Sequence, residues 1–167
     1  MNKKVVVIGI VYSVLVIIYK LIIILGGHQL TKFGFFYSHI LSVFAIIPFM
    51  YLAVRLVRDK DSGGELSGKE AFAAALGVAG IAIIILSVYT YIEFEWKLKG
   101  LSAQYYNSLD YLEFLKGNKN VKPTDYQRII DAQIESLSAM KAVTAKLFSF
   151  LLISISSAFM VGVFARK

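Results

Sequence analysis

The sequence has no cysteine and only two histidines and two prolines among its 167 residues. Without cysteine the chain has no disulfide, no thiol nucleophile and no thiolate ligand for a metal. Zinc sites normally use three or four protein ligands, so His28 and His39 alone argue against a metal site. No catalytic motif offsets these absences. We therefore expect neither a metal nor a cofactor, and no enzymatic activity.

Charged residues are also scarce, at 17% of the chain against about 25% in soluble domains. Lysine and arginine number 18 and aspartate and glutamate 11, which gives a formal net charge of +7. In a chain that is 57% hydrophobic, this excess favours orientation in a membrane and affinity for lipid head groups. We expect no nucleic-acid partner.

Four long apolar runs occupy residues 5–25, 35–54, 71–94 and 142–165. Each is close to the ~20 residues that a helix needs to cross a ~30 Å hydrocarbon core. The runs are continuously apolar and do not alternate, so helices are favoured over barrel strands. The sequence thus predicts an all-α integral membrane protein, a single four-helix domain over residues 1–167.

Basic residues predict how these spans are oriented. They gather in the first residues, in the segment 55–69 and at Arg166 and Lys167, whereas the segment 26–34 carries only Lys32. Lysine and arginine are enriched in cytoplasmic loops. Both termini are therefore expected in the cytoplasm, with residues 95–141 forming an extracytoplasmic helical insert, periplasmic in a bacterium with two membranes.

Local signals predict three further features. Gly26 and Gly27 favour a tight reversal after the first run. Ser67 followed three residues later by Glu70 is the spacing of a capping box, which predicts a helix start there. Pro48 interrupts the backbone bonding of the second run and predicts a kink, either a functional hinge or an ordinary membrane-helix proline.

Small residues recur at helical spacing in the third and fourth runs, which lets membrane helices approach closely. The positions expected to pack against a partner helix are Ala71, Ala75, Ala79, Gly77, Ser154, Ala158 and Gly162. Ala73 shares a face with Gly77. Two interpretations stay open: packing within the four-helix bundle, or docking onto another membrane subunit.

The insert shows two amphipathic stripes joined by a turn at residues 117–122, which predicts a helical hairpin. The second helix is expected to run directly into the last span. The stripe residues expected to make contacts are Leu101, Tyr105, Leu112, Ile130, Ile134 and Leu137. They either pack on one another or form a surface for a periplasmic partner; the mixed charge of the insert suits protein contact better than polyanion binding.

The charged stretch Arg58-Asp59-Lys60, the glycines Gly63 and Gly64 and the helix start from Leu66 to Phe72 resemble a known family. It is a family of small inner-membrane proteins of Bacteroidota, classed as a domain of unknown function. The resemblance covers essentially the whole chain. It implies a bacterial inner membrane, four helices and service as a subunit or accessory, and it carries no catalytic role.

Polar residues inside spans are candidates for function. Lys20, His39 and Lys146 are expected at similar depth near the outer face, with Glu93 as a balancing charge. In one interpretation the lysines extend to the interface and the histidine bonds a neighbouring helix. In the other, Lys20, His39 and Lys146 form a cationic pocket for a lipid phosphate.

Two functions follow as expectations. The first is a non-enzymatic accessory or scaffold subunit of a larger inner-membrane complex, docking through small-residue helix faces onto an integral membrane protein and through the outer hairpin onto a periplasmic one. The second is a lipid-phosphate-binding helper or small transporter that uses the cluster of lysines and histidine. Membrane lipids are partners under either.

Overall fold

The computed structural model describes residues 2–28, 40, 42–61, 63–118 and 121–165. Every regular element in these residues is a helix, which confirms the predicted all-helical class. The chain divides into two compact units. One unit contains Met1–Tyr89 and Ala145–Lys167, and the other contains Thr90–Thr144.

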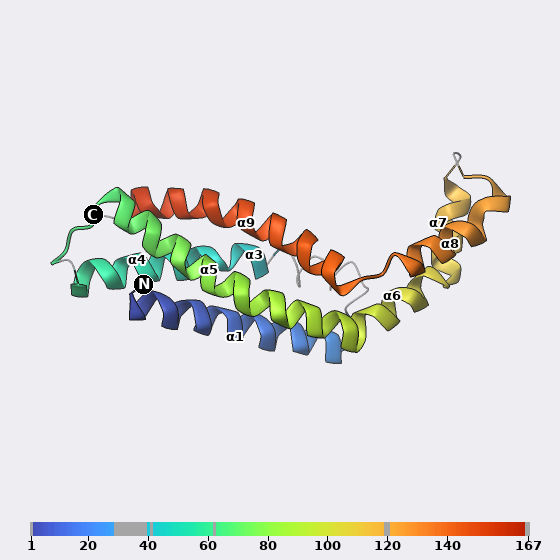
Figure 1. Cartoon of the computed structure of the whole chain (residues 1–167), viewed down its shortest axis with the longest axis horizontal. Coiled ribbons are helices and arrows are strands. Elements are labelled where there is room, and N and C mark those ends of the chain that lie inside the picture. The colour runs from blue at the N-terminus through green and yellow to red at the C-terminus, as the bar shows by residue number, and fades with distance from the viewer. Residues whose placement is uncertain (1, 29–39, 41, 62, 119–120, 166–167) are drawn as a thin grey trace. The chain divides into compact units, whose positions relative to one another are not determined.

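The first unit is a helical bundle built from α1 (Lys3–Leu25), the short α3 (Ser42–Phe44), α4 (Ile46–Asp61), α5 (Gly68–Glu93) and α9 (Ala139–Phe164). The start of α1, the end of α4, the start of α5 and the end of α9 lie together at one end of this bundle (Figure 1). All four long helices contribute to one apolar core. Its fully enclosed side chains include Tyr12, Ile46, Met50, Val78 and Ala158.

Three helices among the described residues are long and apolar enough to cross a membrane: Lys3–Leu25, the continuous helical stretch Gly68–Tyr106, and Ala139–Phe164. They match three of the four predicted spans and indicate a multi-pass membrane protein. The predicted second span, 35–54, is not established as a span, because residues 35–39 and 41 lie outside the described part. What is described there is α3 and α4, and α4 extends beyond the apolar run to Asp61.

Pro48 has the local effect that its chemistry predicts. Its nitrogen carries no hydrogen for the carbonyl of Phe44, and its ring crowds the preceding turn. The helix is interrupted at Ala45, between α3 and α4, three residues before the proline.

Two glycines set the distance between α5 and its neighbours in the bundle. A Cβ atom added at Gly9 of α1 would lie 2.7 Å from the Cβ of Ile81 on α5. A Cβ atom added at Gly162 of α9 would lie 3.2 Å from the backbone nitrogen of Phe72. At both distances a larger residue would force its neighbour to move. The helices α1 and α9 therefore make their close contacts with α5 through these glycines.

The predicted capping box at the start of α5 is confirmed. The Ser67 N–H donates to Glu70 Oε2 over 3.0 Å, and the Glu70 N–H donates to Ser67 Oγ over 3.3 Å. Two backbone donors that the helix leaves unused are thereby satisfied. The turn after α1 also forms as expected, with Gly27 at a φ of 73°, a backbone conformation that glycine adopts without strain.

Arg58 joins the ends of two helices. Its guanidinium donates to the carbonyl oxygen of Ala165 over 3.3 Å and to Asp59 Oδ1 over 2.7 Å. The carbonyls of a last helical turn have no partner within their own helix, and a cation there also meets the negative end of the helix dipole. The hydrogen bond from Arg58 holds the pKa of the Asp59 carboxyl below its ordinary value.

The second unit begins at the end of α5 and contains a π-helix, η2 (Phe94–Leu98), then α6 (Lys99–Tyr106), α7 (Leu109–Gly117), a 3-10 turn, η3 (Pro123–Asp125), and α8 (Tyr126–Glu135). The first predicted stripe is therefore divided between α6 and α7, because Ser108 accepts from the N–H of Tyr111 and starts a new helix. The prediction that the second stripe runs directly into the last span is wrong: α8 ends at Glu135 and α9 begins at Ala139.

Replacing Gly9 by alanine is expected to lower the free energy of unfolding by about 1–3 kcal/mol, because the added methyl group overlaps Ile81. Gly80→Ala is the matched control on α5, since a Cβ atom there meets nothing within 4 Å. That change should cost nothing and can add a few tenths of a kcal/mol through helix propensity. The measurement is unfolding of the purified protein in mixed micelles, followed by circular dichroism. Equal destabilisation by both changes would contradict the packing of α1 on α5.

Arg58→Gln is expected to lower the thermal unfolding midpoint more than Arg55→Gln, whose only described ion pair is a 3.6 Å contact with Asp59 between exposed side chains. The pH dependence should change as well. Because the folded-state pKa of Asp59 is lowered, its stabilising contribution is present above the ordinary carboxyl pKa of about 3.9 and is lost as the pH falls through the lowered value. In thermal scans, the unfolding midpoint of Arg58→Gln should fall less between pH 7 and pH 3 than the midpoint of the unchanged protein does. An equal fall of the midpoint in both proteins would contradict the pairing of Arg58 with Asp59.

Candidate functional site

The two small-residue faces of α5 have different environments. Ala71, Ala75 and Ala79 are fully buried in the bundle core. Gly77 is only half-buried, and its neighbour at helical spacing, Ala73, is exposed. One predicted packing face is therefore occupied inside the bundle, and the other turns outward.

The small residues of α9 pack inside the same bundle. Ser154 and Ala158 are fully buried, and Gly162 lies against the backbone of Phe72. The hydroxyl of Ser154 has no hydrogen-bond partner among the described residues, so this serine contributes by its size. These positions favour the interpretation of packing within the bundle over that of docking.

Of the three residues predicted to bind a lipid phosphate, Lys20 is the best defined. Its side chain is 6% exposed, and its Nζ lies 5.4 Å from the centroid of the Tyr89 ring, a cation–π contact. Lys146 lies partly buried on α9, and His39 lies outside the described residues. Because His39 is outside the described residues, the pocket of Lys20, His39 and Lys146 stays a prediction. The sequence analysis did not anticipate the contact of Lys20 with Tyr89.

Glu93, the predicted balancing charge, is buried more deeply than an interfacial position implies. It is 1% exposed and is the last residue of α5, directly before the π-helix Phe94–Leu98. Thr90, one turn earlier, is buried as well. Such wide turns recur at functional positions, and the sequence gives no signal for this one.

Four of the six predicted stripe residues lie in or against two apolar clusters of the insert. Ile130 and Ile134 lie in a cluster with Tyr111 and Leu115. Leu101 and Leu137 pack against a second cluster formed by Phe94, Leu98 and Ala139. Of the remaining predicted contact residues, Leu112 is partly buried and Tyr105 is largely exposed.

An aromatic group in the insert was not expected from the stripes. Tyr111 lies with its ring centroid 4.9 Å from that of Tyr106, 5.6 Å from that of Tyr105 and 5.9 Å from that of Phe114. Burial, together with the neighbouring phenols, raises the pKa of Tyr111. Phe114 of this group is 64% exposed, and Leu109, two residues before Tyr111, is 77% exposed. The insert thus presents large apolar side chains to its surroundings.

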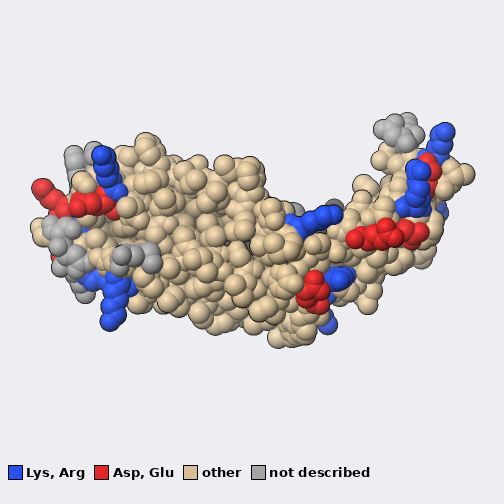
Figure 2. Space-filling view, viewed as in Figure 1, with Lys and Arg blue, Asp and Glu red and all other residues tan. Residues whose placement is uncertain are grey.

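The surface of the bundle separates charged from uncharged areas. On the face shown in Figure 2, Lys, Arg, Asp and Glu side chains gather toward the ends of the bundle and over the insert, and the broad surface between is free of them. This is the distribution expected of a bundle surrounded by lipid.

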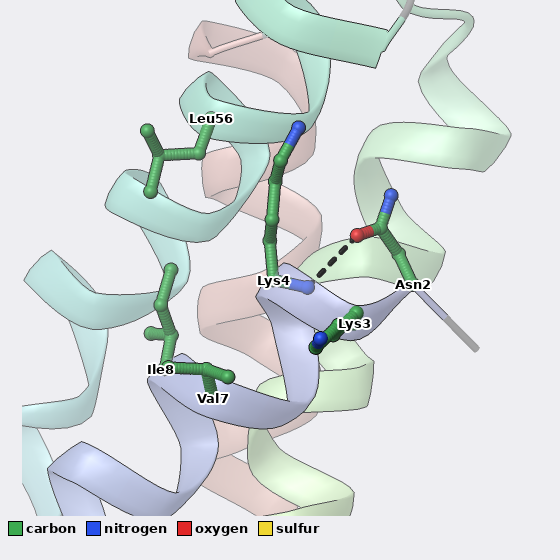
Figure 3. A pocket seen from close by; sticks show the side chains of 6 residues that line it. All are labelled: Asn2, Lys3, Lys4, Val7, Ile8 and Leu56. Atoms are coloured by element: carbon green, nitrogen blue, oxygen red, sulfur yellow. Dashed lines mark hydrogen bonds between the residues drawn. The ribbon is translucent and has the colours of Figure 1, made fainter.

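A hollow of about 580 Å³ lies between α1 and α4 at the end of the bundle where α1 begins. In Figure 3 Lys4 extends from α1 along α4, and the Asn2 carboxamide oxygen accepts from the Lys4 N–H over 2.9 Å. We name this hollow the α1–α4 hollow. Its lining residues are Asn2, Lys3, Lys4, Val7, Ile8 and Leu56. Sequence reasoning used the two lysines only to orient the chain and missed the hollow.

Comparison with known proteins gives one match. The chain matches the family described as "Protein of unknown function (DUF4199)" over residues 6–167. No curated protein and no solved structure matches. Among the described residues no three His, Asp or Glu side chains are grouped closely enough to hold a metal ion. The match extends over nearly the whole chain, both the bundle and the insert, and the protein therefore belongs to the DUF4199 family.

Proposed function

We propose that this protein is a non-enzymatic accessory or scaffold subunit of a larger complex in a bacterial inner membrane, with both termini in the cytoplasm and the insert in the periplasm. The observation that carries the proposal is the outward face of α5, which consists of Ala73, Gly77 and Gly80. Ala73 and Gly80 are exposed and Gly77 is half-buried.

The spacing of these three residues places them on one side of the helix, at positions i, i+4 and i+7. A Cβ atom at Gly80 would meet nothing within 4 Å, so the helix backbone is accessible there. Ile84 and Val88 continue the same side as exposed aliphatic residues. Small residues followed by aliphatic ones provide a surface on which a second membrane helix packs closely.

Contact with lipid alone does not explain why glycine occupies this surface of α5. Association in a membrane depends on close packing, because lipid tails are as apolar as leucine. Each glycine in a helix interior costs up to about 1 kcal/mol relative to alanine in helix propensity. Gly9 and Gly162 recover this cost by packing inside the bundle. We infer that Gly80 recovers it by packing against a helix of an integral membrane partner.

The insert supports a second contact, with a periplasmic protein. Leu109 and Phe114 project from α7 as large exposed apolar side chains. Ion pairs lie elsewhere on the surface of the insert, including Lys99 with Glu95 and Arg128 with Asp125. Apolar anchors within a surface of mixed charge are typical of protein interfaces.

Gly80→Leu should strongly reduce capture of the membrane partner, because its side chain occupies the place of the incoming helix. The tagged protein is purified from its native membrane in mild detergent, and the proteins that copurify are identified and quantified by mass spectrometry. We expect a stoichiometric larger membrane protein with the unchanged chain and about tenfold less with Gly80→Leu.

Ser156→Leu is the matched control, since it places the same leucine side chain at an exposed position of α9. It should leave capture unchanged, and both variants should unfold at the temperature of the unchanged protein. Equal capture by Gly80→Leu, or no stoichiometric membrane partner at all, would contradict the proposal.

Leu109→Gln should remove a periplasmic partner and retain the membrane partner, because the leucine is exposed in the insert and belongs to neither of its clusters. Gln127→Ala, an exposed substitution on α8, is the control and should retain both partners. The same purification and quantification measure this outcome. Loss of both partners together in Leu109→Gln would contradict a separate role for the insert.

A further inference from the structure

We propose that the α1–α4 hollow binds an anionic glycerophospholipid, with the phosphate at Lys3 and Lys4 and the first part of an acyl chain against Val7 and Leu56. This inference does not depend on the accessory role. It concerns the opposite end of α1 from Lys20, and it takes the hollow as a site for one lipid molecule.

The position of the lining residues along α1 corresponds to the layers of a lipid leaflet. Lys3 and Lys4 are in the first turn of a helix that is long and apolar enough to cross the membrane, where head groups lie. Val7 and Ile8 follow one turn later, about 6 Å deeper at 1.5 Å per residue. The lining of the hollow is therefore basic where the anionic head group of a phospholipid lies and apolar where its acyl chains begin.

The charge at this end of the bundle favours a phosphate. Lys3 and Lys4 are the charged residues that line the hollow. The positive end of the α1 dipole adds to this field. Basic hollows between membrane helices are typical binding sites for anionic head groups.

The apolar wall distinguishes a lipid from a free phosphate. Val7 is about half exposed, Leu56 is partly buried and Ile8 is buried, so one side of the hollow is aliphatic. An inorganic phosphate gains nothing from such a wall, whereas an acyl chain removes it from water. A volume of about 580 Å³ accommodates a head group with the first carbons of a chain.

The test measures lipid retained by the purified full-length protein in detergent. Phosphatidylglycerol and phosphatidylcholine of the same chain length are added in equal amounts, and bound lipid is counted by native mass spectrometry. We expect a strong preference for phosphatidylglycerol. Lys3→Gln combined with Lys4→Gln should reduce that preference by about tenfold or more, given the contribution of each basic residue at an anionic surface.

The control removes the same number of charges from the same end of the bundle outside the hollow, by Arg55→Gln combined with Lys69→Gln. Its preference for phosphatidylglycerol should change by less than about twofold. Val7→Trp is a second variant that fills the hollow and keeps both lysines; it should reduce retention of the lipid. Circular dichroism spectra and unfolding temperatures establish that each variant is folded.

Three results would overturn the proposal. Equal retention of the two lipids would show that no anionic site exists. An equal loss with the lysine pair and with its control would show that total charge, and not the hollow, attracts the lipid. Displacement of phosphatidylglycerol by inorganic phosphate at equal concentration, together with no effect of Val7→Trp, would show an anion site without a lipid.

Discussion

The bundle depends on the close approach of helix backbones at two glycines, Gly9 and Gly162. Lipid gives helices no hydrophobic reason to associate, so the helices are held by the closeness of their packing. Gly9 brings α1 onto α5 at Ile81, and Gly162 brings α9 onto α5 at Phe72. The helix α5 therefore approaches both α1 and α9 closely, and its inward alanines lie in the bundle core. Its outward side carries Ala73 and Gly80, which are exposed, and Gly77, which is half-buried.

Much of the fold could be predicted, since in a membrane the length of an apolar run defines a helix. The runs 5–25, 71–94 and 142–165 agree with α1, α5 and α9 to within three residues at each end. The divisions of the insert could not be predicted from its stripes. The chain leaves the helix before Ser108 because that hydroxyl offers the backbone an alternative partner, and the apolar spacing continues across the break regardless.

The candidate sites were less predictable, because they depend on which elements meet. The sequence shows two faces of small residues on α5, and both are equally apolar. Only the positions of α1 and α9 decide that Ala75 turns inward and Ala73 outward. Lys3 and Lys4 are visible in the sequence as a basic pair, but the wall formed by Leu56 comes from a helix more than 50 residues away. The contact of Lys20 with Tyr89 is likewise visible only in the three-dimensional structure.

The π-helix Phe94–Leu98 has a consequence for comparing members of the family. A wide turn of this kind contains one residue more than the same length of regular α-helix needs. It is equivalent to a single inserted amino acid that the helix absorbs without ending. A relative without that residue would present the side chains of α6 rotated by about 100°. Alignments of such chains therefore need a one-residue gap between Glu93 and Lys99, or every later position of the insert is assigned to the wrong side of its helix.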